Sequence, residues 1–233
     1  MTRRAEGADL AILGREQLPV RLVLASASPR RRELLGRLGV AFEVVPSAVE
    51  ESLRDDVPAE ALARDLALRK ARDVAERLDP AGGRAAVVLG ADTLVVLDDR
   101  PLGKPGSRAD ARAMLRSLAG RSHEVVTAVA LVEAPPGREA VEAVVSGVVM
   151  RAYSEAAIEA YLSTDEPYDK AGAYAVQGAA RAFILRVEGC YTNVVGLPIT
   201  TTARLLRTFG FTALEPPGLT VGAVSDRGEP GRS

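Results

Sequence analysis

The fold class is indicated by one short junction in the sequence, Leu24-Ala25-Ser26-Ala27-Ser28-Pro29-Arg30-Arg31. The preceding apolar residues predict a buried strand over 21–25, and a loop of small residues then leads directly into a helix. Ser28 suits the N-cap of that helix, and Pro29 suits its first turn. A strand that passes at once into a helix is typical of α/β proteins.

Strand and helix signals continue to alternate on both sides of this junction. Helices are predicted over 58–78, 107–118, 154–163 and 198–209, and strands over 42–45, 85–91 continued by 93–97, 125–132, 141–150 and 183–187. The strands at 125–132 and 141–150 read as a long hairpin that would form most of a second lobe. The pattern predicts a mixed sheet with helices on its faces.

Composition is that of an ordinary globular protein. The chain has 233 residues, of which 47% are hydrophobic and 26% charged, enough for one compact domain or two small lobes. Residues 1–19 are expected to be a flexible extension, 20–212 the folded domain, and 213–233 a disordered tail rich in Pro and Gly. With 30 basic and 31 acidic residues, the net charge of -1 argues against nucleic acid as a partner.

Several other classes are disfavoured by what the sequence lacks. Cys190 is the one cysteine, which excludes an internal disulfide and a paired-cysteine zinc site and fits a reducing compartment. No apolar stretch is long enough to span a bilayer, and no apolar signal region precedes residue 25. We therefore expect a cytoplasmic protein with no membrane partner. His123, the one histidine, is expected to be structural, and no Gly-x-Ser-x-Gly or Walker A sequence is present.

The junction itself predicts an anion site. Free N–H groups and the positive end of the helix dipole favour an anion at the start of the helix. Ser26 adds a hydroxyl donor, and Arg30 and Arg31 add charge and paired donors suited to phosphate. The alternative is an N-cap followed by a solvated basic turn. Because cations oppose the dipole at this end of a helix, the phosphate site is favoured.

Asp92 interrupts an otherwise apolar strand. A carboxylate in such a position is costly unless it is paired, bound to a metal or exposed in a cleft. We place it near a strand end, where ligands usually bind in open α/β sheets. The alternative is a strand-end aspartate that faces water.

Lysines and a second acidic site complete the candidate set. Lys70 falls on the apolar stripe of the helix at 58–78, where it either snorkels to the surface or projects into a cleft; the pattern leaves both open. Lys104 lies in a turn and Lys170 in a loop. The pair Glu50-Glu51 follows a strand, and with Asp92 these carboxylates suit a hard cation such as Mg²⁺.

In order and spacing, the motifs of this chain resemble those of the Maf (septum formation inhibitor) family of nucleoside triphosphate pyrophosphatases. Besides the junction, they are Glu50-Glu51, Gly90-Ala91-Asp92-Thr93, Gly103-Lys104-Pro105, Gly120-Arg121-Ser122-His123, Thr127-Ala128-Val129, Asp169-Lys170-Ala171-Gly172-Ala173-Tyr174, Gln177-Gly178 and Asn193-Val194-Val195-Gly196-Leu197-Pro198. The resemblance covers nearly all of residues 21–209. It implies a mixed twisted sheet with flanking helices, in two lobes around a deep cleft, related to the inosine triphosphate pyrophosphatases.

The resemblance also implies roles for individual residues. Asp92 would be the general base in a reaction that depends on a divalent cation, Mg²⁺ or Mn²⁺, held by Glu51 and Asp92. The triphosphate and metal would be surrounded by Ser26, Arg31, Glu51, Lys70 and Lys104. Arg30, Thr93 and Gln177 match positions linked to substrate choice. Many members of the family are homodimers.

Lys170 and Gln177 lie in motifs that look like the branch of the family that hydrolyses dTTP and UTP. Ala175, Ala180 and Cys190 depart from the residues common in the family, which bears on nucleobase preference. One alternative is an enzyme that removes modified nucleotides. Another is a non-catalytic nucleotide-binding regulator of cell division, but a pure binder has no need of the base and cation-binding residues together.

Overall fold

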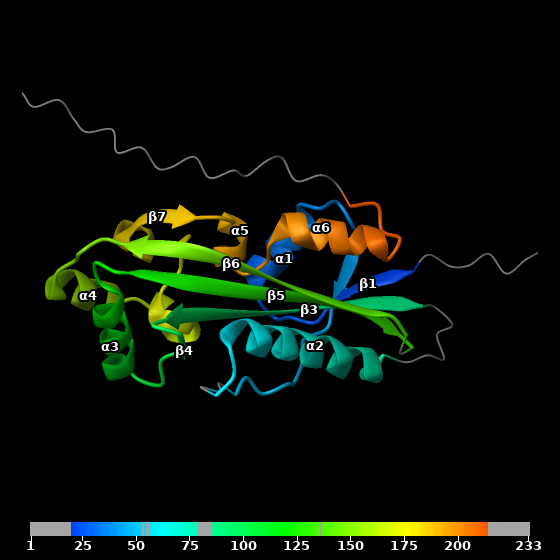
Figure 1. Cartoon of the computed structure of the whole chain (residues 1–233), viewed down its shortest axis with the longest axis horizontal. Coiled ribbons are helices and arrows are strands. Elements are labelled where there is room, and N and C mark those ends of the chain that lie inside the picture. The colour runs from blue at the N-terminus through cyan, green and yellow to red at the C-terminus, as the bar shows by residue number, and fades with distance from the viewer. Residues whose placement is uncertain (1–19, 53, 55, 79–84, 136, 214–233) are drawn as a thin grey trace, which may run out of the picture.

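The protein is described by a computed structural model that covers residues 20–52, 54, 56–78, 85–135 and 137–213. The predicted extension over 1–19 and nearly all of the predicted tail, 214–233, lie outside the described residues. The described chain forms a seven-stranded sheet with helices packed against it, and Figure 1 shows the arrangement. The predicted α/β class is confirmed.

The sheet is mixed. Its strands are β1 (Arg21–Leu24), β2 (Phe42–Val44), β3 (Ala86–Leu97), β4 (Arg100–Leu102), β5 (Ser122–Ala134), β6 (Glu139–Met150) and β7 (Ile184–Glu188). They lie in the order β2-β1-β3-β5-β6-β7, and β4 pairs with β3. β1 is parallel to both of its neighbours, whereas all the other pairs are antiparallel. Short β4 was not expected, because its residues were assigned to a turn and the segment after it.

The helices begin and end close to the predicted positions. They are α1 (Pro29–Gly36), α2 (Ala59–Arg77), α3 (Arg108–Leu118), α4 (Glu155–Leu162), α5 (Tyr191–Val195) and α6 (Ile199–Thr208), with 3₁₀ segments η2 (Glu166–Asp169), η3 (Ala171–Ala173) and η4 (Ala179–Phe183). Short α5 and the three 3₁₀ segments had no counterpart in the sequence prediction. They are too short to show a periodic apolar pattern.

Alternate residues of the central strand face two different cores. Val87 and Leu89 of β3 pack with α1, α5 and α6, whereas Val88 of β3 packs with α2. Figure 1 shows α2 on one side of the sheet and α1 and α6 on the other. A third core gathers α3 and α4 around the opposite end of the long strands. Because both faces of β3 are covered, its sequence is apolar almost without a break.

The long hairpin does not form most of a separate lobe, which corrects the sequence prediction. β5 pairs with β3 from Ala86 opposite Ala134 to Val96 opposite Glu124. Leu131 of β5 belongs to the core with α1 and α6, but Val125 of the same strand belongs to the core with α3 and α4. The hairpin therefore runs through both ends of the molecule and joins them.

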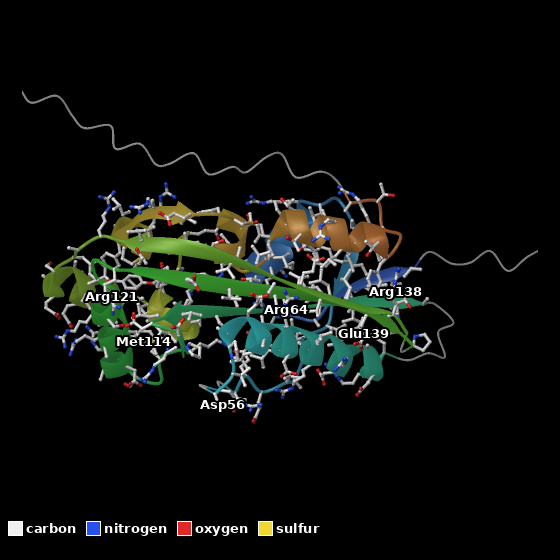
Figure 2. All side chains as sticks on the ribbon, in the orientation of Figure 1. Asp56, Arg64, Met114, Arg121, Arg138 and Glu139 are labelled. Atoms are coloured by element: carbon white, nitrogen blue, oxygen red, sulfur yellow. The ribbon has the colours of Figure 1, made fainter. Side chains whose placement is uncertain are left out.

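Exposed ion pairs lie on the surface toward both ends of the sheet. Arg72 of α2 pairs with Glu139 of β6, at a distance of 2.5 Å, and Arg121 pairs with Asp98 at 2.6 Å. Figure 2 shows Glu139 and Arg121 toward opposite ends of the sheet. Exposed pairs of this kind add little stability each. Within the described residues, no helix has the length and apolar character needed to cross a membrane.

Candidate active site

A cavity of about 820 Å³ opens beside the middle of β3. Glu50, the neighbour of Glu51 in the acidic pair, does not line it, but the ten residues predicted to form the site do: Ser26, Arg30, Arg31, Glu51, Lys70, Asp92, Thr93, Lys104, Lys170 and Gln177. They come from segments as far apart in the sequence as the first strand–helix junction and the loop before η4. The fold thus brings together every predicted site residue.

The junction has the predicted geometry. β1 ends at Leu24, and the next amide, that of Ala25, donates to Leu89 O at 2.8 Å and keeps the loop beside β3. Ser28 is the N-cap of α1, since its Oγ accepts a hydrogen bond from the Arg31 amide at 3.4 Å, and Pro29 is the first helical residue. The N-terminus of α1 therefore faces the cavity, which is the arrangement that favours an anion.

Arg31 is held on three sides. Its Nε donates to Gly196 O at 2.9 Å, Nη1 to Ser26 Oγ at 3.3 Å and Nη2 to Thr93 Oγ1 at 3.0 Å. Burial lowers the pKa of Arg31, and the nearby carboxylates of Asp92 and Glu51 oppose that shift. An arginine starts from so high a pKa that it remains a cation. The guanidinium is thus a fixed positive charge in the wall of the cavity.

Lys70 projects into the cavity and joins two carboxylates. It is only 5% exposed, so it does not snorkel to the surface. Its Nζ donates to Glu51 Oε1 and to Asp92 Oδ1, each at 2.6 Å. The other oxygen of Glu51, Oε2, accepts from Lys104 Nζ at 2.8 Å. Partial burial alone would raise the pKa of Glu51, but the hydrogen bonds from Lys104 and Lys70 lower it to about 2.

The close approach of α2 to β3 explains how Lys70 meets Asp92. Leu62, Leu66 and Val74 of α2 pack on the face of β3 that also carries Gly90 and Asp92. A Cβ at Gly90 would lie 2.3 Å from the carbonyl oxygen of Ala67 on α2. A glycine therefore lets the helix backbone come close at this point, one turn before Lys70.

Asp92 lies in the middle of β3, not near a strand end as predicted. The apolar residues on both sides belong to one long strand, as the predicted continuation of 85–91 by 93–97 implied, so the position of Asp92 is central in it. Asp92 nevertheless lies where ligands bind in open α/β sheets. The parallel neighbour β1 ends at Leu24, opposite Leu89, so β1 does not pair with the part of β3 that carries Asp92. Asp92 is 3% exposed, and its Oδ2 has no hydrogen-bond partner among the described residues.

The segment from η2 to η4 lines the part of the cavity that contains Lys170 and Gln177. Lys170 Nζ donates to Glu166 O at 3.0 Å and also to Asp169, whereas Gln177 is exposed at the rim. The Glu166 carboxylate accepts from the Ala179 amide at 2.9 Å and so fixes the start of η4. Sequence reasoning missed Glu166, because its role depends on contacts that only the folded chain makes.

His123 has the structural role that was predicted for it. Its Nε2 lies 2.7 Å from the hydroxyl of Tyr174, and the two rings meet edge to face. Tyr174 in turn lines the cavity. No sequence pattern predicts this contact, since the two residues are 51 positions apart.

The donor set fits a divalent cation that is shared with a ligand. Among the described residues, no three His, Cys, Asp or Glu side chains form a group that could hold a metal. The cavity does offer the carboxylates of Glu51 and Asp92, and the buried Oδ2 of Asp92 has no hydrogen-bond partner where the structure describes the chain. Mg²⁺ is commonly bound through one or two carboxylates together with substrate phosphates and water. These two residues suit that mode of binding.

Fold and site together describe an α/β protein whose cleft suits a phosphorylated ligand. The Maf-like protein family matches this chain over residues 21–209, and the chain belongs to that family. This confirms the resemblance seen in the motifs.

Named relatives cover most of the chain. The dTTP/UTP pyrophosphatase of Moorella thermoacetica is 52% identical over 190 residues, which cover 82% of this chain and 95% of the relative. The dTTP/UTP pyrophosphatase of an Anaeromyxobacter species is 51% identical over 193 residues, 82% of this chain and 90% of the relative. A solved nucleoside-triphosphatase / dITP/XTP pyrophosphatase from Mycobacterium abscessus is 22% identical over 56% of this chain and 73% of that one, with a TM-score of 0.35.

Proposed function

We propose that this protein is a nucleoside triphosphate pyrophosphatase that hydrolyses dTTP and UTP to the monophosphate and pyrophosphate. The relatives that bear this name are about half identical to the chain over most of their length. The observation that carries the proposal is the state of Asp92. One of its oxygens is held by Lys70, and the other is a buried acceptor with no hydrogen-bond partner in the described part of the chain, in a residue that lines a cationic cavity.

The cavity accounts for binding of the triphosphate. Its volume is within the range of small-molecule sites. The N-terminus of α1 and the Ser26 hydroxyl supply hydrogen-bond donors, and Arg30, Arg31 and Lys104 supply positive charge. These groups line the same cavity as Asp92, and they would hold the phosphates next to the base.

The reaction is an in-line displacement at the α-phosphorus. A water molecule attacks, a new P–O bond forms, and the bond to the bridging oxygen of the β-phosphate breaks, so that pyrophosphate leaves. Asp92 takes the proton of the attacking water as the general base. Arg31, Lys70 and Lys104 stabilise the negative charge that develops on the phosphate oxygens.

A divalent cation, Mg²⁺ or Mn²⁺, would be held by Glu51 and Asp92. When bound, it would neutralise charge on the phosphates and polarise the reacting phosphoryl group. Lys70 keeps both carboxylates turned toward each other, with 2.6 Å contacts to each.

Choice of nucleobase is assigned to the other part of the cavity. Lys170 and Gln177 lie there with Ala175, whose methyl group occupies a position where the family often has glycine. A preference for modified nucleotides over dTTP and UTP would be decided by these residues. It would leave the reaction at the phosphate unchanged.

The test is to incubate the purified protein with dTTP, UTP, CTP, 7-methyl-GTP and ITP, each with Mg²⁺ or Mn²⁺, and to identify the products. We expect pyrophosphate with dTMP or UMP. Asp92→Asn should lower kcat by about 10²- to 10⁴-fold, the range for a general base. Asp65→Asn, an exposed change on α2, is the matched control and should retain activity.

Other results of the nucleotide assay would contradict separate parts of the proposal. Turnover of a different nucleotide alone would retain the reaction and overturn the substrate. Release of orthophosphate would reject attack at the α-phosphorus. Full activity of Asp92→Asn would reject its role as the base, and no turnover with any nucleotide would favour the regulator of cell division.

A further inference from the structure

Thr127 is completely buried in β5 and does not line the cavity, yet it is linked to the cavity through hydrogen bonds. Its exposed fraction is 0%. Its Oγ1 donates to the carbonyl oxygen of Asn193 at 2.9 Å and lies 2.9 Å from Thr93 Oγ1. Thr93 Oγ1 in turn accepts from Arg31 Nη2 at 3.0 Å. Two hydroxyl groups thus connect Arg31 to the backbone of α5.

The directions of these hydrogen bonds are fixed by counting protons. A threonine hydroxyl has one proton to donate. That of Thr127 goes to a carbonyl oxygen, which can only accept, so Thr127 must accept from Thr93. The proton of Thr93 is therefore used within the protein. Thr93 can accept hydrogen bonds from Arg31, but it has none to donate to a substrate.

The chain of hydroxyls determines how Arg31 is presented. The guanidinium has five N–H donors, and Gly196, Ser26 and Thr93 accept three of them. No other described residue accepts from the remaining donor on each terminal nitrogen, and two donors is the number that a bidentate phosphate contact uses. Both ends of the support lie on α5 or directly after it, at Asn193 and Gly196. Loss of the link to Asn193 would free one edge of the guanidinium.

We propose that Thr127 is a positioning residue that acts through Thr93 to orient Arg31 toward the substrate phosphates. This inference rests on the proposed function. It gives Thr93 a role at the phosphates beside the substrate choice that its position is linked to, so that loss of the Thr127 hydroxyl affects dTTP and UTP alike.

The experiment compares Thr127→Val, which has nearly the same shape without the hydroxyl, with Thr127→Ser, which keeps it. We expect Thr127→Val to lower kcat/KM by about 10- to 100-fold for dTTP and UTP alike, as misplacement of a catalytic contact does. Thr127→Ser should restore most of the activity. In an Arg31→Lys background, Thr127→Val should cost little more, because lysine cannot make the forked contact.

The result that overturns the proposal is a Thr127→Val protein within about twofold of the wild type, or one whose ratio of dTTP to UTP activity changes. Thermal unfolding of each variant separates loss of orientation from loss of fold. If Thr127→Val does not fold, Thr93→Val cuts the same chain one hydroxyl earlier and should show the same uniform loss.

The hydrolysis of dTTP and UTP by the wild type tests the proposed function, whereas phosphate binding by the Thr127 variants tests the orientation of Arg31. If the wild type hydrolyses neither dTTP nor UTP, the proposed function is wrong. Calorimetric binding of inorganic tripolyphosphate then tests the inference alone. Weaker binding to Thr127→Val than to Thr127→Ser supports it, and equal binding overturns it.

Discussion

At the scale of single residues, His123 shows how burial sets a protonation state. Burial lowers the pKa of His123 from 6.5 to about 4. Burial also raises the pKa of Tyr174, its partner, so that the phenol stays protonated at neutral pH. His123 therefore stays neutral in the native state, while the unfolded chain binds a proton near pH 6.5.

This difference predicts a defined dependence of stability on pH. The contribution of His123 is fully present above pH 6.5 and is lost as the pH falls to about 4, on the order of 3 kcal/mol in total. Urea unfolding of the wild type and of His123→Gln measures it, because glutamine can accept from Tyr174 but does not titrate. The wild type should lose more stability than the variant over this window.

The chain has only one histidine, so its titration can also be followed directly by NMR. A midpoint near 4 is expected. A midpoint near 6.5, together with stability curves that run parallel for wild type and variant, would show that the imidazole is accessible to water in the native state.

At the scale of elements, the contact between α2 and β3 places the pair of Lys70 and Asp92. A side chain at Gly90 would meet the backbone of α2, which has no flexible end that could move away. Gly90→Ala should lower the free energy of unfolding by about 1–3 kcal/mol, as overpacking does. It should also lower activity, because β3 carries Asp92 two residues further on. Urea unfolding and steady-state kinetics check the two effects.

Gly36 offers the matched control for this prediction. It is the last residue of α1, and a Cβ there would meet no atom of the described residues within 4 Å. Gly36→Ala should leave stability unchanged or raise it slightly, since alanine favours a helix over glycine. If Gly90→Ala and Gly36→Ala changed the free energy of unfolding equally, the close packing of α2 against Gly90 would not be what restricts this position to glycine.

The same element shows what sequence can and cannot predict. The four-residue apolar stripe of α2 and the unbroken apolar run of β3 predicted both elements, and the two charges on them stood out as anomalies. The contact between Lys70 and Asp92 was not predictable, because the apolar stripe of α2 does not indicate which strand the helix packs against or in what register. For the same reason Glu166 was missed as a support of the site, and Thr127 stood out only as part of a family motif with no role assigned. The role of each depends on its partner in the fold, Ala179 or Thr93.

At the scale of the whole molecule, the cavity joins parts of the chain that are distant in sequence. Ser26 follows the first strand, Asp92 and Lys104 lie in the middle of the chain, and Gly196 precedes the last helix, yet all four line one cavity. A ligand that contacts them together binds only the folded chain. Binding must therefore stabilise the native state by mass action.

Stabilisation by ligands therefore shows which part of the nucleotide the cavity recognises. With Mg²⁺ and α,β-methylene-UTP, whose bridging carbon replaces the oxygen that would leave, the free energy of unfolding should rise by about 2.7 kcal/mol at 100 times Kd. Uridine, which has no phosphates, is the control and should give little effect at the same concentration. Because Arg31 and Lys104 are assigned to the phosphates, the triphosphate analogue should stabilise the protein more than uridine does. If uridine stabilised the protein as much as the analogue, the base would supply the binding energy, and the assignment of Arg31 and Lys104 to the phosphates would fail.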